Sequence, residues 1–390
     1  MERLPAVVVG GSLNALGVVR SLARGGMPIY LLETTRRCPA AWSRHSAYVP
    51  VGALEGPGLT DTLVALGTRL ACRPVLILTG DQSVNWVSSH REQIEPLYRI
   101  SLPSDEVVRA LSDKTLFQEM AEREGFPVPR AVCVTGAADL ERLATLTPPL
   151  IVKPADKTLV LSGLVERAVQ AATLAQAQHA CARMLPPARR LIVQEWIDGP
   201  DTDIFFTLFS CDGGGRPLGL FCGRKLVCSP PAIGNTAVCS AAPEMAAELT
   251  APTLHFIERL GYRGLGSLEF KRDARSRRCL IVEPTVGRTD WQEEIATLCG
   301  VNLPLMTYYR ELGRDAPATP ARAAPLAWRS SAAFRAPLAA GVRTVDGFFR
   351  WSDPLPALYY YGYERGLGRV WHRAVRAKQP LSPARDRGRE

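Results

Sequence analysis

The segment Gly266–Arg288, with the sequence GSLEFKRDARSRRCLIVEPTVGR, contains two runs of β-forming residues separated by a polar stretch. The runs Ser267–Lys271 and Cys279–Glu283 predict a β-hairpin with a longer loop. If this loop closes symmetrically about Ser276, side chains that alternate across the pleat give the hairpin one apolar face. We expect that face to contain Leu268, Phe270, Leu280 and Val282.

The opposite face of the hairpin carries two glutamates, Glu269 and Glu283, as cross-strand neighbours. Like charges whose Cβ atoms are about 5 Å apart destabilise a sheet, so a cation between them is expected. Magnesium is typically held by one or two carboxylates, while substrate phosphates and waters complete its coordination. The hairpin therefore predicts the metal half of a nucleotide site. The alternative is a pair of solvated glutamates on an edge hairpin.

Length and composition indicate an ordinary globular protein. The chain has 390 residues, of which 46% are hydrophobic and 22% charged, enough for two or three domains. Disordered and fibrous classes are therefore excluded. No apolar run approaches the roughly 20 residues of a membrane span, and the N-terminus enters a strand-like AVVVGG run directly. We expect a cytoplasmic protein without a transmembrane segment.

Cysteine and histidine spacing argues against two common kinds of site. The ten cysteines show no C-x-x-C motif, and the five histidines form no cluster. Structural zinc sites and disulfide frameworks both need such spacing, so we expect free, mostly buried thiols.

The formal net charge of +9 is concentrated near the C-terminus. Residues 361–390 carry eight Lys or Arg against three acids. Such a tail can contact an anionic membrane surface or a nucleic acid, or it can simply be solvated. We expect no nucleic-acid partner and at most a weak surface contact by the tail.

The N-terminal stretch VVVGGSLNALGVVRSLARGGMPIYLLE predicts a Rossmann-like βαβ unit. Gly10, Gly11 and Gly17 match the dinucleotide fingerprint only loosely, because the G-x-G-x-x-G spacing is absent. Glu33 ends the second strand, where a ribose-binding acid would lie, so NAD binding is an open alternative. Asp81 follows the strand-like PVLILTG and could face a ligand crevice.

The remaining sequence predicts further α/β structure. Ser112, Asp113 and Lys114 are expected within one helix, and Lys153 on a strand in PPLIVKPADK. After Gly313, an excess of Ala, Pro and Arg predicts a linker or loose extension. We expect four parts, formed by residues 1–104, 105–190, 191–313 and 314–390.

Six short motifs in this order resemble the ATP-grasp superfamily: SDK, GFPVP, IVKP, QEWIDGPD, LEF and VEP. The similarity covers about residues 5–312, with the βαβ unit as the pre-ATP-grasp domain. The GRK and EPTVGR segments are most similar to carboxylate–amine ligases related to D-aspartate ligase. The resemblance implies an α/β ATP-grasp fold with an N-terminal Rossmann-like domain, two ATP-grasp lobes (105–190 and 191–313) and a basic C-terminal extension.

The same resemblance implies a nucleotide site. Lys114 and Lys153 would hold the α- and β-phosphates of ATP. The backbone of a connecting segment would contact adenine, and an acid after it would bond the ribose. These residues are Glu195, Trp196 and Ile197 for the connector, and Asp201 or, failing that, Asp203 for the ribose.

The resemblance also implies a catalytic set around the γ-phosphate. Lys225 would reach the γ-phosphate or an acyl phosphate, and Arg288 would clamp the substrate or the transferring phosphoryl group. Many relatives read Glu-x-Asn at the second metal site, whereas this chain reads Glu283-Pro284-Thr285. Thr285 offers a hydroxyl where Asn offers a carbonyl, which predicts weaker binding of a second magnesium ion.

A further departure concerns the lid over the phosphates. The segment KPADKTLVLSGLVERAV has only Gly163, where relatives have a glycine-rich flap. We therefore expect an atypical lid.

The expected function is ATP-dependent formation of an amide or peptide bond between a small carboxylate and an amine, with ATP and Mg²⁺ as cofactors. An acyl phosphate is the expected intermediate, and a homodimer is possible. One alternative is an ATP-binding module with little or no turnover, favoured by Thr285 and the lid. Another is an NAD-dependent oxidoreductase.

Overall fold

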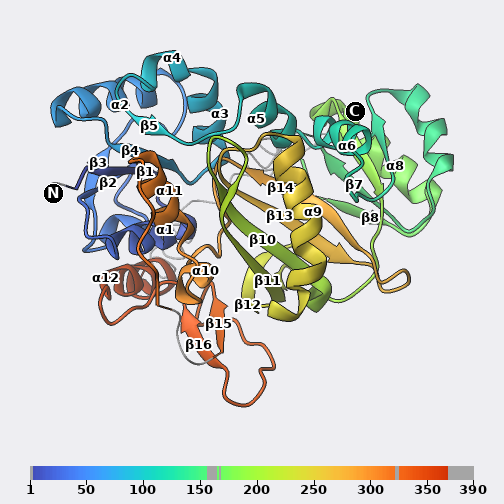
Figure 1. The fold of residues 1–390 in the computed structure, drawn as a ribbon. Helices are drawn as coiled ribbons and strands as arrows, with labels where there is room; N and C mark the ends of the chain where they lie inside the picture. Colours follow the sequence, from blue (N-terminus) through green and yellow to red (C-terminus); the bar gives the residue numbers. More distant parts are fainter. Residues whose placement is uncertain (1–2, 156–164, 167, 321–324, 368–390) are drawn as a thin grey trace, which may run out of the picture.

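The computed structural model describes residues 3–155, 165–166, 168–320 and 325–367. Its strands form a five-stranded, a four-stranded and a seven-stranded sheet. In Figure 1 the N-terminal sheet lies at one end, the four-stranded sheet at the other, and the largest sheet between them. Among the described residues, no helix is both long enough and apolar enough to cross a membrane.

The N-terminal sheet is entirely parallel, with strand order β3-β2-β1-β4-β5. Its strands are short and rich in Val, Leu and Ile, as expected for a sheet covered on both faces. The elements are β1 (Ala6–Val9), α1 (Leu13–Ala23), β2 (Ile29–Glu33), η1 (Pro39–Trp42), β3 (Ala47–Pro50), α2 (Pro57–Leu70), β4 (Val75–Leu78), α3 (Asp81–Ser89), α4 (Arg91–Ile94) and β5 (Arg99–Ile100). The predicted βαβ unit is confirmed.

Two helices connect this sheet to the next one. The expected single helix around Lys114 is instead α5 (Asp105–Ser112) followed by α6 (Lys114–Glu124), so that prediction was wrong. Asp113 is extended, with φ −107° and ψ 124°, and its side chain accepts the N–H groups of Thr115 and Leu116. This N-cap separates the helices because an aspartate satisfies free amides best at a helix start. Lys114 therefore begins a helix.

The four-stranded sheet is antiparallel, with the order β6-β9-β7-β8. Its elements are β6 (Ala131–Val134), η2 (Ala137–Thr145), β7 (Leu150–Pro154), β8 (Val169–Ala171), α8 (Leu174–Ala188) and β9 (Leu191–Glu195). β9 forms its ladder with β6 and β7, so it belongs to this sheet. The expected boundary at residue 190 therefore falls too early.

The seven-stranded sheet has the order β14-β13-β10-β11-β12-β15-β16. Figure 1 shows α9 across one face of its β10 and β11 strands. Between the sheet and the N-terminal domain lie α10 and α11. The elements are η3 (Asp201–Asp203), β10 (Ile204–Cys211), β11 (Pro217–Ser229), β12 (Asn235–Ala241), η4 (Pro243–Met245), α9 (Ala246–Arg259), β13 (Gly264–Arg272), β14 (Cys279–Val286), α10 (Glu294–Leu298), α11 (Leu303–Glu311), β15 (Leu326–Arg329), β16 (Arg343–Asp346), α12 (Leu355–Leu358) and η5 (Tyr359–Leu367).

The C-terminal segment is not the linker that its composition predicted. β15 pairs with β12, and β16 pairs with β15, so both extend the largest sheet. Trp328 on β15 is fully buried in a core cluster that also contains Leu16 of α1. Composition missed this because a single four-residue strand with one tryptophan is enough to anchor the segment.

The predicted hairpin is confirmed as β13 and β14, with Glu269 paired to Glu283. Leu268 and Phe270 are fully buried, as expected. The expectation that Leu280 and Val282 share their face was wrong, because Phe270 pairs with Ile281. Val282 is therefore the extra residue of a β-bulge, and it is Ile281, not Leu280 or Val282, that joins the core.

Candidate active site

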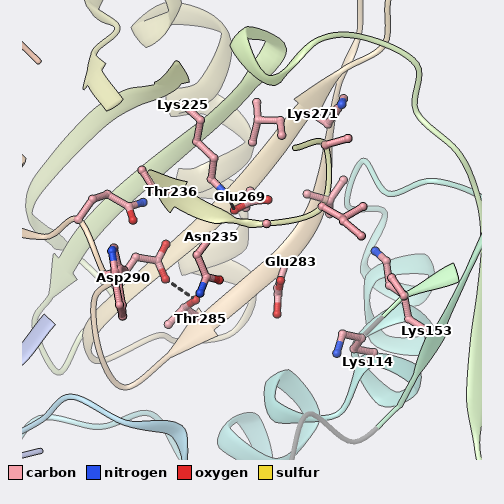
Figure 2. Close-up of a pocket in the computed structure, with 18 of the residues that line it drawn as sticks. Lys114, Lys153, Lys225, Asn235, Thr236, Glu269, Lys271, Glu283, Thr285 and Asp290 are labelled. Carbon is pink, nitrogen blue, oxygen red and sulfur yellow. Dashed lines mark hydrogen bonds and ion pairs between the residues drawn. The ribbon is translucent and has the colours of Figure 1, made fainter. Parts of the chain in front are cut away.

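A cavity of about 490 Å³ is lined by residues from the N-terminal domain, the four-stranded sheet and the seven-stranded sheet. Lys114 and Lys153 line it on one side, whereas Glu269, Glu283 and Lys225 line it on the other (Figure 2). The two sides come from segments more than 70 residues apart in the chain.

Lysines are concentrated at this cavity. The sequence contains six lysines among 47 basic residues, and the others are arginines. The structure describes four of these lysines, and all four line the cavity: Lys114, Lys153, Lys225 and Lys271. A lysine ammonium is a compact point charge that can bind phosphate, as can an arginine guanidinium. The gathering of four lysines therefore favours an anionic ligand.

The carboxylate pair on the hairpin forms one wall of the cavity. Lys225 lies on β11, which is separated from β13 by β10, and its Nζ atom lies 2.5 Å from Oε2 of Glu269. Burial alone would lower the pKa of Lys225, but Glu269, together with Cys228 and Asp290, outweighs burial, and the pKa is raised. Lys225 is therefore a charged ammonium held beside the predicted metal position.

A magnesium ion fits this carboxylate pair. Among the described residues, no group of three or more His, Cys, Asp and Glu side chains is arranged to hold a metal. Glu269 and Glu283 are nevertheless direct cross-strand partners on the cavity wall. Magnesium needs only one or two carboxylates when phosphates and waters supply its other ligands.

Lys114 and Lys153 reach the cavity from the other side, as Figure 2 shows. The Nζ atom of Lys153 donates to Oε1 of Gln194 at 3.1 Å. The Lys114 backbone N–H donates to the carbonyl of Ala155, which ties the start of α6 to the end of β7. Lys114 is thus positioned by α6 and Lys153 by β7.

The connector after β9 lines the cavity with Glu195, Trp196 and Ile197. The Glu195 carboxylate accepts the backbone N–H of Thr147 at 2.9 Å, so its side chain holds a neighbouring loop. The ammonium of Lys271 lies 5.4 Å from the centre of the Trp196 ring and donates to the carbonyl of Gly199. Burial lowers the pKa of Lys271.

Neither proposed ribose ligand lines the cavity. The two carboxylate oxygens of Asp201 accept the backbone N–H groups of Cys228 and Ala232, both at 2.8 Å. Asp203 accepts a hydrogen bond from Arg272 at 2.5 Å. A contact of either acid with ribose stays a prediction. In the structure, Asp201 binds backbone N–H groups and Asp203 binds Arg272.

Arg288 lines the cavity beside the N-terminal domain. Its Nε donates to Oδ1 of Asp81 at 2.7 Å, and Asp81 itself lines the cavity. Burial would lower the pKa of Arg288, but Asp81, together with Asp290 and Glu283, outweighs burial, and the pKa is raised. The guanidinium is therefore a fixed, permanent cation.

Thr285 lines the cavity but donates its hydroxyl to Oδ1 of Asp290 at 2.8 Å. Ser267 donates to the other oxygen of Asp290 at 2.6 Å. The role of Thr285 as a metal ligand stays a prediction. Asn235 of β12 lines the same cavity (Figure 2).

Sequence reasoning missed several cavity residues, including Lys271, Asn235, Asp290 and Asn14. The rarity of lysine would have identified Lys271. Asn235 and Asn14 carry no such signal, because an asparagine after a turn is ordinary turn chemistry.

The acid proposed for NAD binding does not line the cavity. Glu33 is buried, and its Oε1 accepts both the N–H and the hydroxyl of Thr34. The expected lid includes residues 156–164 and 167, and most of the basic tail is 368–390; these lie outside the described residues.

Several solved structures match the fold over about 80% of the chain. N5-carboxyaminoimidazole synthetase from Staphylococcus aureus has 13% identity and a TM-score of 0.63, with 81% of this chain and 79% of that chain covered. N5-carboxyaminoimidazole ribonucleotide synthetase from Thermus thermophilus has 16% identity and a TM-score of 0.60, with 80% of each chain covered. The chain has the ATP-grasp fold.

A third match is the biotin carboxylase domain of 2-oxoglutarate carboxylase from Hydrogenobacter thermophilus. It has 15% identity and a TM-score of 0.63, with 81% of this chain and 71% of that chain covered. No protein-family model and no curated protein matches the sequence itself. At these identities the likeness concerns the fold alone, and function rests on the site.

Proposed function

We propose that the chain is an ATP-dependent carboxylate–amine ligase that forms an amide or peptide bond and releases ADP. The observation that carries this proposal is the cavity that gathers four lysines, Arg288 and the opposed carboxylates of Glu269 and Glu283. The neighbour from Hydrogenobacter thermophilus was crystallised with the magnesium salt of ADP, which supports ATP and magnesium here.

The chemistry explains why these residue types are gathered. A carboxylate is a poor electrophile because its leaving group would be oxide, so it is first converted to an acyl phosphate that an amine can attack. Lys114 and Lys153 would bind the α- and β-phosphates, and the connector backbone would contact adenine. A magnesium ion on Glu269 and Glu283 would neutralise charge on the β- and γ-phosphates.

Lys225 and Arg288 would act on the transferring phosphoryl group. Both cations are held by acid partners, Glu269 and Asp81, so they are oriented before the reaction begins. Preorganised donors of this kind stabilise the transition state, and removing one typically costs about 3–4 kcal/mol. On its GRK and EPTVGR segments, we place the chain with ligases related to D-aspartate ligase.

The second candidate is an ATP-binding module without turnover. It is favoured by Thr285, whose hydroxyl is given to Asp290. The two candidates differ in whether an acyl phosphate forms.

Hydroxylamine distinguishes them, because it converts acyl phosphates to hydroxamates. With ATP, magnesium, a panel of small carboxylates and no amine, the ligase should yield hydroxamate and ADP in equal amounts. Arg288→Ala should slow this reaction by about a hundredfold or more. The control is Arg259→Ala, because Arg259 is an exposed partner of Glu124 outside the cavity. If ATP binds but no carboxylate yields hydroxamate, the ligase proposal fails and the binding module replaces it.

A further inference from the structure

The N-terminal domain contributes its own crevice to the cavity. β1 and β4 are adjacent parallel strands with Val9 paired to Leu78, and the chain leaves them toward opposite edges of the sheet. This is the topological switch point, where open parallel sheets bind ligands at the carboxyl ends of their strands. Asn14 follows β1 and Asp81 follows β4, and both line the cavity.

Asn14 has a buried acceptor whose orientation is fixed. Only 2% of the residue is exposed, and its Nδ2 donates to the carbonyls of Thr289 and Asp290. Reversing the amide would place Oδ1 against two carbonyl oxygens, so the assignment follows from the contacts. Within the described part of the chain, Oδ1 has no hydrogen-bond donor. A buried acceptor without a donor is costly, so this site calls for a ligand that donates.

The second acceptor in the crevice is the carboxylate of Asp81. Arg288 connects the two acceptors, because it donates to Asp81 at 2.7 Å and to the Thr289 carbonyl at 3.0 Å. Asn14 donates to the same Thr289 carbonyl. Asn14 and Asp81 therefore flank the cation that the proposed function places on the transferring phosphoryl group.

Arg288, the cation between Asn14 and Asp81, is already paired with the carboxylates of Asp81 and Asp290, so the crevice does not favour an anionic ligand group. None of the described residues before residue 105 that line the cavity is a lysine or an arginine. The Thr79 hydroxyl is directed to the carbonyl of Val9 at 2.7 Å. A buried amide oxygen and a carboxylate select a donor that carries positive charge.

We propose that Asn14 and Asp81 bind the ammonium group of the amine substrate, and that this substrate is a small primary amine without a phosphate. The inference rests on the proposed function and names its amine substrate class. It separates this chain from its neighbour from Thermus thermophilus, whose name specifies a ribonucleotide. A phosphate at the switch point would need a cation in addition to Arg288, which is already paired with Asp81.

Calorimetry on the full chain tests this inference without requiring turnover. The protein is saturated with magnesium and a non-hydrolysable ATP analogue, then titrated with the twenty common amino acids, ethanolamine and putrescine. O-phosphoethanolamine and ribose 5-phosphate are the phosphate-bearing probes, and ethylene glycol is the probe without an ammonium. We expect at least one unphosphorylated amine to bind, at least tenfold more tightly than any phosphate-bearing probe or ethylene glycol.

Asn14→Ala should weaken the strongest of these amines at least tenfold. The matched control is Asn85→Ala, because Asn85 lies on α3 of the same domain, bonds Ser112 and does not line the cavity. Asp81→Asn keeps an acceptor for Arg288 but removes the negative charge, so it should also weaken amine binding. This variant tests the inference if Asn14→Ala does not fold. Binding of no amine, tighter binding of a phosphate-bearing probe, or equal binding by the folded variants would overturn the inference. Amine binding without hydroxamate formation would instead contradict the ligase proposal alone.

Discussion

Glu269 and Glu283 are paired across β13 and β14 and line the same cavity, so each carboxylate lies in the field of the other. Glu283→Gln keeps the shape of the side chain and removes one charge, which relieves repulsion and should leave the fold intact. We expect magnesium-dependent ATP turnover to fall at least about a hundredfold, because one of two metal carboxylates is lost. ADP release at several magnesium concentrations measures this.

The control for this substitution is Glu244→Gln. Glu244 is a partly exposed partner of Arg224 at 3.1 Å and does not line the cavity. Wild-type turnover with an unchanged magnesium dependence in Glu283→Gln would contradict the metal assignment.

Glu293 makes stability depend on pH. It is fully buried between α1 and α10, where its carboxyl group contacts the hydroxyls of Ser21 and Thr297. Burial, followed by the charge of Glu294, raises the pKa of Glu293 from 4.5 to about 8. The folded protein therefore keeps a proton that the unfolded chain releases between these two values.

Because the folded state binds the extra proton, the contribution of Glu293 to stability is greatest below about pH 4.5 and is lost as the pH rises to about 8. The slope from this group is about 1.4 kcal/mol per pH unit. Glu293→Gln imitates the neutral acid and should flatten the dependence over this range. Urea unfolding at pH 5.5, 6.5 and 7.5 checks this, and a slope equal to that of the wild type would show that Glu293 is ionised in the fold.

Strand identity and the Glu269–Glu283 pair of the β13–β14 hairpin could be predicted from the sequence, because alternation and one symmetric loop determine them. The bulge at Val282 could not, since an extra residue in a ladder leaves the local composition unchanged. The split at Asp113 was missed for a similar reason. Asp113 ends one helix and begins the next by capping the N–H groups of Thr115 and Leu116, whereas the helical periodicity of the sequence continues on both sides of it.

Contacts between distant elements were the least predictable feature. Lys114, Lys153 and Lys225 were predicted from motifs. Asn14 could be identified only from the structure, in which the N-terminal domain lines part of the cavity. Asp201 matched its motif but is used to hold a turn.

Close packing of β10 against β11 positions Lys225. Gly223 pairs with Phe206, and a Cβ at Gly223 would overlap the buried ring of Phe206. Gly223→Ala should destabilise the protein by about 1–3 kcal/mol because the ring cannot move freely in the core. Gly58→Ala on α2 meets no atom within 4 Å and should stabilise it by about 0.4–1 kcal/mol. Denaturation in urea measures both, and equal effects would contradict this packing.

The C-terminal segment stabilises the whole molecule through the N-terminal domain. Asp353 accepts hydrogen bonds from Arg20 of α1 at 2.9 Å and from Ser43 at 3.0 Å. Trp328, fully buried, fills the core between the two regions. The last strands therefore help to fix the N-terminal crevice against the largest sheet.

Two tryptophans of this segment provide a matched test. Trp328→Ala should cost about 3–5 kcal/mol, because it leaves a large cavity. Trp351 is 89% exposed, and Trp351→Ala should change stability by less than about 0.5 kcal/mol. Thermal and urea unfolding of the full chain measure the difference. A small loss in Trp328→Ala would mean that the segment is dispensable for the core.

Nucleotide binding should stabilise the molecule as a whole, because the cavity is built from all three sheets. ATP with magnesium at a hundred times its Kd should raise the free energy of unfolding by about 2.7 kcal/mol, whereas NAD should have no such effect.

Lys153→Met keeps the apolar stem and removes the ammonium, so it should weaken ATP binding by about 1–3 kcal/mol through a lost charge-assisted hydrogen bond. The control is Arg183→Met on α8 of the same domain, because Arg183 pairs with Glu166 at the surface. Thermal unfolding over a series of ATP and NAD concentrations measures both affinities. If NAD stabilises the protein more than ATP and Lys153→Met has no effect, the phosphate-binding role of the lysines is wrong and the oxidoreductase alternative takes its place.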